Sequence, residues 1–179
     1  MQGSLLVAHP LLNDGFFNRS VIYLTNHNEE GSLGFILNFK TQFKLRDVRP
    51  QVKNGNFPIY EGGPVAKDQL FFLHKLGDKI GDALHIKDNV WFGGDFGDLL
   101  HGIEHGTIKQ SDVRFFVGYS GWGDGQLEKE IESTSWIMND ASERNIFIPD
   151  TDSLWKNSLQ EKKPGYGIFA DIGFDPSRN

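Results

Sequence analysis

The sequence predicts an α+β fold. Segments with the composition of β-strands dominate the first half of the 179-residue chain. Helical segments interrupt them at irregular intervals, and the lack of a regular βαβ alternation argues against a doubly wound parallel sheet. The length suits one domain with its own core, so we expect a single domain over residues 1–179. From about residue 162 the chain carries proline, glycine and charge, which favours a loosely packed tail.

Short runs of β-branched, aromatic and aliphatic residues predict the strands. They are expected at residues 5–8, 20–25, 33–39, 58–61, 70–74, 83–86, 90–92, 114–119, 136–138 and 145–148. The polar connection 26–31 ends in glycine, which indicates a hairpin between the second and third runs. A second hairpin is expected between 83–86 and 90–92, and a glycine-rich loop at 121–125.

Four helices are expected, at residues 45–48, 95–105, 126–132 and 152–159. Pro50 ends the first, because the residue before a proline is pushed out of the helical region. Asp150 or Thr151 is the expected N-cap of the last. Apolar residues at spacings of three and four make the second helix amphipathic: Phe96, Leu99, Leu100 and Ile103.

Composition excludes several classes of function. The chain has no cysteine, which rules out disulfides, thiolate metal sites and cysteine nucleophiles. Its net charge of -6 argues against non-specific nucleic-acid binding, which depends on lysine and arginine. No apolar run approaches the ~20 residues of a membrane helix, and the apolar N-terminal stretch is too short for a signal peptide. We therefore expect a soluble, cytoplasmic protein without membrane contact.

The glycine-rich segment 118–125 lies between a strand and a helix, the arrangement that cradles phosphate in many proteins. It lacks the spacing of a P-loop or of a dinucleotide site, and Asp124, Glu128 and Glu130 would repel an anion. A tight turn that lets Trp122 pack is the stronger interpretation. Ser120 is not expected to be a nucleophile, because Trp122 stands where a nucleophile elbow requires glycine.

Two further patterns have simple structural explanations. His101 and His105 with Glu104 match a zinc motif, but no third ligand is evident and a solvated helix end explains them. His74 at the end of a strand is expected to be satisfied by a main-chain carbonyl. No metal, cofactor or catalytic residue is predicted.

Residues 40–53 carry five cations against one carboxylate, a local charge of +4. The segment lacks a helix-turn-helix signature or a stacking platform for bases. A solvated face explains it, and direct contact with nucleic acid is not expected.

Six ordered segments together resemble the YqgE/AlgH family of small bacterial proteins. They are GSLLVAHP (3–10), DGFFNRSVI (14–22), HNEEGSLGFILN (27–38), GGPV (62–65), FLH (72–74) and FVGYSGWGDGQLEKE (116–130). The resemblance runs from about residue 3 to 159, and the tail after residue 162 falls outside it.

The resemblance implies an α+β fold in which a bent, bifurcated, mostly antiparallel sheet forms a pseudo-barrel with flanking helices. It implies no enzymatic activity, although some members are labelled transcriptional regulators. It gives no residue a role. The motif positions fall here on Asn38, Gly62, Gly63, Pro64, His74, Gly118, Tyr119, Gly121, Trp122, Gln126, Glu128 and Glu130.

Two hypotheses of function follow. The first is a non-enzymatic regulatory protein that acts through a protein partner. The contact surface would include Tyr119, Trp122, Gln126 and Glu128. The alternative for the two aromatic residues is that they pack in the core. The second is a small-molecule or anion-binding protein, or an unrecognised enzyme. Its pocket would form where residues 62–64, His74 and residues 118–125 converge. The sequence predicts no oligomeric state.

Overall fold

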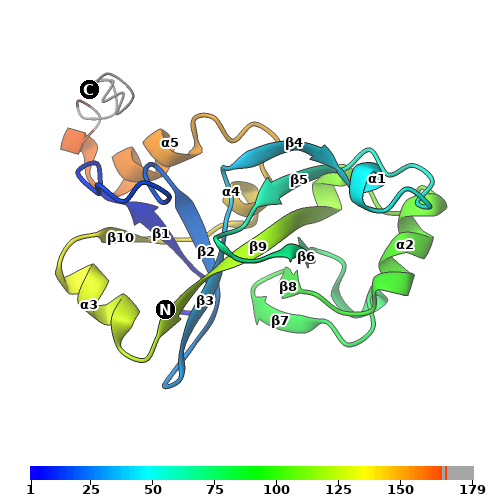
Figure 1. Ribbon diagram of the computed structural model, residues 1–179, viewed down its shortest axis with the longest axis horizontal. Helices are drawn as coiled ribbons and strands as arrows, with labels where there is room; N and C mark the ends of the chain where they lie inside the picture. Colours follow the sequence, from blue (N-terminus) through cyan, green and yellow to red (C-terminus); the bar gives the residue numbers. More distant parts are fainter. Residues whose placement is uncertain (167, 169–179) are drawn as a thin grey trace.

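The computed structural model describes residues 1–166 and 168 (Figure 1). Over these residues it has one bifurcated sheet of ten strands flanked by helices, which confirms the predicted α+β fold. The strands are β1 (Ser4–Ala8), β2 (Val21–Asn28), β3 (Gly31–Ile36), β4 (Lys40–Lys44), β5 (Pro58–Glu61), β6 (Val65–His74), β7 (Leu84–Lys87), β8 (Val90–Phe92), β9 (Val113–Gly123) and β10 (Trp136–Asp140).

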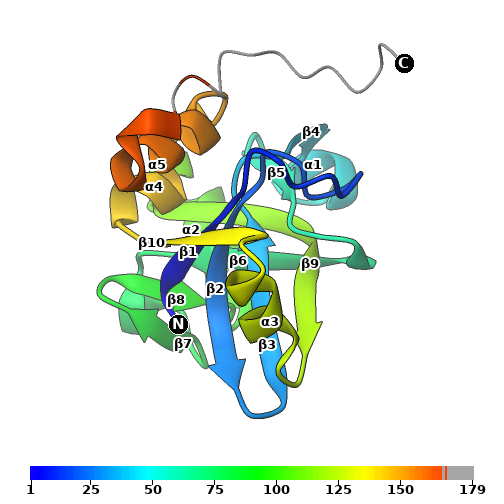
Figure 2. The same cartoon turned by 90° about the vertical axis from the view of Figure 1, so that its left-hand side faces the viewer.

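The helices lie outside the sheet (Figures 1 and 2). They are α1 (Leu45–Val48), α2 (Phe96–Glu104), α3 (Gln126–Glu132), α4 (Glu143–Phe147) and α5 (Leu154–Lys162), with short 3₁₀ turns η1 (Gly77–Lys79), η2 (Gln110–Asp112) and η3 (Pro164–Tyr166). Within the described residues, none of the helices has the length and apolar character that crossing a bilayer requires.

Strand β9 is the branch point of the sheet and crosses the middle of the molecule in Figure 1. Its second half pairs with β3, its first half pairs with β5, and β6 pairs along the opposite edge. The main path runs β10-β1-β2-β3-β9-β6-β8-β7, and only the β5–β9 pair is parallel among the described strands. The ends of this path, β10 and β7, do not pair, so the curved sheet stays open.

Gly63 and Gly118 allow the turn between β5 and β6 to lie directly on β9. Their φ angles are +159° and +71°. A Cβ atom on Gly63 would lie 2.1 Å from the carbonyl carbon of Tyr119, and one on Gly118 would lie 2.4 Å from the carbonyl oxygen of Gly63. Only residues without a side chain permit this approach.

Two groups of buried side chains fill the two sides of the branch. Phe35 and Phe116 belong to the larger group, which packs under α3, α4 and α5. Leu99 and Phe115 belong to the smaller group, under α1 and α2. Neighbouring residues of β9 therefore serve different cores, because successive side chains of a strand point to opposite faces.

Most predicted elements are confirmed with small shifts at their ends. Both hairpins form, and β5, α1 and α3 have the predicted bounds. Strand β4 was not predicted, because its polar sequence KTQFK lacks an apolar alternation. The tail predicted from about residue 162 lies largely outside the described residues.

The predicted loop at 121–125 is wrong at its start. Strand β9 continues through Gly123, where Gly121 pairs with Leu33 and Gly123 pairs with Gly31. Glycine has little local preference for a strand, and the partner comes from a hairpin that is distant in sequence. Tertiary pairing therefore decides the structure of this segment.

The predicted strand at 145–148 is also wrong, because α4 occupies most of this segment. The hydroxyl of Ser142 accepts a hydrogen bond from the main-chain N–H of Asn145, and the Asn145 side chain accepts one from the Ser142 N–H. This reciprocal cap starts a helix that buries Ile146 and Phe147. The N-cap of α5 is Ser153, not Asp150 or Thr151.

Candidate functional site

Several motif positions hold the branch of the sheet together. Asn38 accepts a hydrogen bond from the N–H of Val21 at 2.8 Å and donates one to the carbonyl of Arg19 at 2.9 Å. The hydroxyl of Ser120 is buried and donates to the carbonyl of Gly62 at 3.0 Å. Asn38 thus ties the start of β2 to the segment after β3, and Ser120 ties β9 to the turn after β5, so both side chains serve the scaffold.

Glu130 on α3 accepts hydrogen bonds from two indoles. Trp122 Nε1 lies 2.9 Å and Trp136 Nε1 lies 2.8 Å from the same carboxylate oxygen. The other oxygen accepts from Gln126 Nε2 at 2.9 Å, and Gln126 Oε1 accepts from the N–H of Gly123 at 3.0 Å. Trp122 is 6% exposed, so most of its surface packs internally. The network fixes α3 against β9 and β10.

His27 and Ser32, which the sequence analysis did not single out, form a row of polar side chains with Glu128 that joins the β2–β3 hairpin to α3. His27 Nδ1 lies 2.8 Å from Ser32 Oγ, and His27 Nε2 lies 3.5 Å from Glu128 Oε1. Serine, histidine and glutamate are also the groups of a hydrolase triad. Ser32 is only 8% exposed, which leaves its hydroxyl little access to a substrate. The row explains the position of Glu128 as an anchor for α3.

A hollow of about 370 Å³ lies beside the GGPV and glycine-rich segments, where a pocket was predicted. Val65, 41% exposed, follows the exposed Pro64 and pairs with Tyr119 across the sheet. The charged residue of the lining is Glu30, and no cation contributes to it. Apolar lining residues include Leu33, Val65, Tyr119 and Trp122.

His74 does not take part in this hollow. It lies at the far end of β6, opposite Val113, whereas Val65 at the near end is opposite Tyr119. The buried ring is satisfied on both sides, because Nε2 lies 3.0 Å from the carbonyl oxygen of Gly93 and Nδ1 accepts from the N–H of Leu76. The expected convergence of three segments is therefore wrong for His74.

The rings of His101 and His105 lie 4.1 Å apart near the end of α2, and His105 is the C-cap. His105 Nδ1 bonds to the carbonyl of His101 at 2.8 Å. Over the described part of the chain, no group of three histidine, aspartate or glutamate side chains is placed to hold a metal ion.

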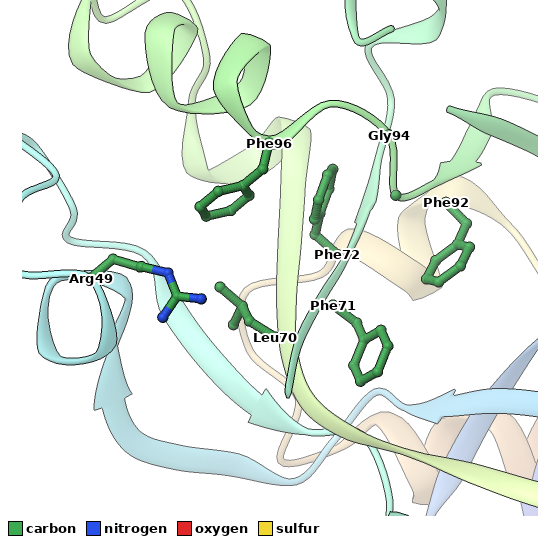
Figure 3. Close-up of a pocket in the computed structure, with 8 residues that line it drawn as sticks. Arg49, Leu70, Phe71, Phe72, Phe92, Gly94 and Phe96 are labelled. Carbon is green, nitrogen blue, oxygen red and sulfur yellow. The ribbon is translucent and has the colours of Figure 1, made fainter. Parts of the chain in front are cut away.

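A cavity with an apolar lining lies between β6, β8, α1 and α2, and we call it the aromatic cleft. It has a volume of about 400 Å³. Figure 3 shows Leu70 and the rings of Phe72 and Phe96 on one side of β6, and the rings of Phe71 and Phe92 on its other side. Residues 70–72 present side chains on both faces of β6 beside the cleft. They form a free edge of the strand, because β8 pairs with β6 only from Leu73 onward.

Arg49 is the charged residue of the aromatic cleft. It is the C-cap of α1, and its guanidinium extends toward Leu70 and Phe96 in Figure 3. The guanidinium carbon lies 5.9 Å from the centre of the Phe96 ring, and Nη1 donates to the carbonyl of Val48 at 2.9 Å. No described carboxylate forms an ion pair with it. An unpaired guanidinium beside apolar rings is suited to an acidic group on an apolar ligand.

The aromatic cleft was missed because its parts are ordinary in sequence. Residues 70–74 indicate a buried strand, and Phe96 fits the apolar face of a helix. The basic segment 40–53 was identified and assigned to a solvated face, but its Arg49 faces the cleft. The spacing of phenylalanines cannot show that β8 leaves β6 at Gly93, which opens the edge.

Another hollow is larger but less suited to a specific ligand. It has about 780 Å³ between β10, α4 and α5 and is lined by side chains of both charges, including Asp140, Arg144 and Glu161. It has no aromatic wall. Among these cavities, the aromatic cleft combines a ligand-sized apolar wall with a cation.

Comparison with known proteins places the chain among relatives of similar length. A family model described as AlgH-like matches residues 5–167. A UPF0301 protein from Cytophaga hutchinsonii is 39% identical over 179 residues, covering 99% of this chain and 98% of that protein. One from Parabacteroides distasonis is 41% identical over 181 residues, covering 100% and 91%.

Two solved structures share the fold. The solution structure of the AlgH protein from Pseudomonas aeruginosa has a TM-score of 0.76 at 26% identity and covers 94% of this chain and 92% of its own. The crystal structure of a protein from Corynebacterium diphtheriae has a TM-score of 0.75 at 22% identity, covering 94% and 90%.

Proposed function

The chain belongs to the AlgH-like family, and from the aromatic cleft we propose that it is a non-enzymatic binding protein for a small amphipathic anion. The observation that carries the proposal is the unpaired guanidinium of Arg49 at a cleft walled by Leu70, Phe71, Phe72, Phe92 and Phe96. An aromatic or aliphatic body would pack between the rings, and a carboxylate or phosphate would bind Arg49.

The volume limits the size of the ligand. At the ~30 Å³ that one water molecule occupies in the liquid, 400 Å³ holds about a dozen non-hydrogen atoms. Burial of an apolar group of this size supplies roughly 25 cal/mol for each Å² removed from water. A charge-assisted hydrogen bond to Arg49 adds about 1.5–3 kcal/mol. Millimolar to micromolar affinity is the expected range.

The electrostatic surroundings support an anion over a neutral ligand. Arg49 belongs to the segment 40–53, whose local charge is +4 in a chain of net charge -6. The hollow beside Tyr119 has the opposite character, because its charged lining residue is Glu30. This contrast in charge favours the aromatic cleft over the hollow beside Tyr119 as a site for an anion.

The test is calorimetric titration with 2-naphthoate, which is about the right size, and with 2-naphthalenemethanol, which has the same rings without the charge. We expect naphthoate to bind more tightly. Arg49→Gln should weaken naphthoate binding by about tenfold and leave the alcohol unchanged, because a charged hydrogen bond is lost. The matched control is Arg46→Gln, which removes the same charge from an exposed position of α1 outside the cleft.

Two results would contradict the proposal. One is equal affinity for the acid and the alcohol, which would mean that Arg49 does not recognise the charge. The other is an equal loss in Arg46→Gln and Arg49→Gln, which would indicate general attraction to the basic segment.

A regulatory role through a protein partner, and a cytoplasmic location, remain predictions. Trp122 and Gln126 both donate hydrogen bonds to Glu130, so these polar groups are engaged within the protein. The exposed apolar part beside them is Val65 with the half-buried Tyr119.

A further inference from the structure

A second cation, Arg114, lies on the other side of the branch from the aromatic cleft. It is buried without a counter-charge among the described residues. Arg114 in β9 is 4% exposed, and its guanidinium carbon lies 4.4 Å from the centre of the Tyr60 ring. Nη1 donates to the carbonyl of Leu37 at 3.1 Å, and Nη2 donates to the carbonyl of Ile148. No carboxylate among the described residues forms an ion pair with it. Two carbonyls leave part of its five donors unused.

Burial without a counter-ion is unfavourable for this side chain. Desolvation lowers the pKa of the Arg114 guanidinium to about 10, and the nearby Tyr60 opposes this shift. Arginine stays protonated at neutral pH, so the charge remains inside the protein. Buried charges in proteins are normally paired.

Arg114 lines a cavity of about 300 Å³, and we call it the Arg114 cavity. It brings together residues of β4, β5, η2 and β9 with the segment that follows α4. The exposed Lys40 is a second cationic residue of the lining, and Tyr60 and Ser111 are lining residues that carry hydroxyl groups. Phe147 forms part of the apolar wall.

The lining of the Arg114 cavity is positively charged, whereas the chain as a whole is negatively charged. Two cations and no acidic residue line the cavity, although the chain as a whole carries a net charge of -6. Like Arg114, Lys40 forms no ion pair with a described carboxylate. The positive charge of the lining therefore has no carboxylate partner among the described residues.

We propose that the Arg114 cavity binds the oxyanion group of a small metabolite, a carboxylate or a phosphate. The planar guanidinium offers parallel N–H donors to two oxygens of such a group. Lys40 would neutralise the remaining charge at the mouth, and the hydroxyls of Tyr60 and Ser111 are further donors. None of the residues of this site lines the aromatic cleft, so the two sites are separate.

The test is NMR titration of the ¹⁵N-labelled full chain with inorganic phosphate and, separately, with acetate, at constant ionic strength maintained with chloride. We expect a saturable shift of the Arg114 Nε–Hε resonance below about 20 mM, where a site with a millimolar Kd is nearly filled. Saturation by either anion supports the proposal, and the tighter of the two identifies the acidic group.

The variants keep the test independent of folding. Lys40→Gln should weaken the binding about threefold, as expected for loss of an exposed ion pair. Tyr60→Phe keeps the ring beside Arg114, removes only the hydroxyl and should also weaken binding. The matched control, Lys53→Gln, removes the same charge from an exposed position of the basic segment outside the cavity and should leave the Kd unchanged.

Three results would overturn the proposal. The first is no saturable shift at Arg114 with either anion. The second is an equal loss of affinity in Lys40→Gln and Lys53→Gln, which would indicate diffuse attraction. The third is a shift centred on Arg49, which would place the anion in the aromatic cleft instead.

Discussion

Removing the carboxylate of Glu130 should be among the most damaging single changes on the surface of the protein. Its Oε2 accepts both indole N–H groups, from Trp122 at 2.9 Å and from Trp136 at 2.8 Å. The two indoles are 6% and 4% exposed. In Glu130→Ala both donors would lose their partner in a place that water reaches poorly.

The magnitude follows from the number of donors. A buried donor left without a partner costs about 1–3 kcal/mol, so two of them cost about 4 kcal/mol in the free energy of unfolding. Partial entry of water beside the half-buried Glu130 reduces the expected loss to about 3 kcal/mol. Glu130→Gln keeps one oxygen that can accept from both indoles, but an NH2 group replaces the oxygen that accepts from Gln126 Nε2, so its cost should be about 1–2 kcal/mol.

Urea unfolding followed by tryptophan fluorescence measures these differences directly. Glu132→Ala is the matched control, because Glu132 is exposed on the same helix. It should change the free energy of unfolding by less than about 0.5 kcal/mol. A loss below about 1 kcal/mol for Glu130→Ala, or equal losses for the alanine and glutamine variants, would refute this reasoning.

Two further predictions concern the scaffold. Gly63→Ala should lower the free energy of unfolding by more than about 3 kcal/mol or prevent folding, because a Cβ there would lie 2.1 Å from the Tyr119 carbonyl carbon. The control in the same urea assay is Gly15→Ala, because a Cβ on Gly15 would have no atom within 4 Å. Burial holds the pKa of His74 below its usual value, and the hydrogen bond to the Gly93 carbonyl only partly opposes this. The unfolded chain therefore binds the additional proton first, so stability should fall as the pH drops below about 6.5 and rise again toward neutrality. His74→Gln should show a smaller change in unfolding free energy between pH 7.5 and 5.5 than the natural chain, and an unchanged pH slope would exclude His74 as its source.

Local chemistry was enough to predict elements whose start and stop are encoded nearby. Helix α1 ends where Pro50 requires it, and Asp95 caps α2 by accepting from the N–H of Asp98 at 2.9 Å. Segments whose structure depends on distant partners were not predicted. Gly121 and Gly123 become strand because Leu33 and Gly31 pair with them. Strand β4 exists because β5 lies beside it.

The candidate sites also divide into features that the local sequence predicts and features that depend on distant residues. His74 stands at the end of a strand, and from this place we predicted a hydrogen bond to a main-chain carbonyl. In the structure that carbonyl belongs to Gly93. The aromatic cleft and the Arg114 cavity were not predicted. Each depends on side chains from several elements and on where a strand leaves its neighbour, which spacing along the chain does not encode.

The residues that carry the family resemblance act mainly on the fold. Gly63 and Gly118 permit the contact between the β5–β6 turn and β9, and Asn38 and Glu130 tie neighbouring elements together. The cations of the two proposed sites, Arg49, Lys40 and Arg114, lie outside the six segments of resemblance. The shared residues at the branch point predict how the sheet divides. The close contacts of Gly63 and Gly118 leave no room for larger side chains there. It leaves open which ligand is bound, since that depends on cations placed around the branch. The anion titrations, and not the shared segments, therefore decide what this chain recognises.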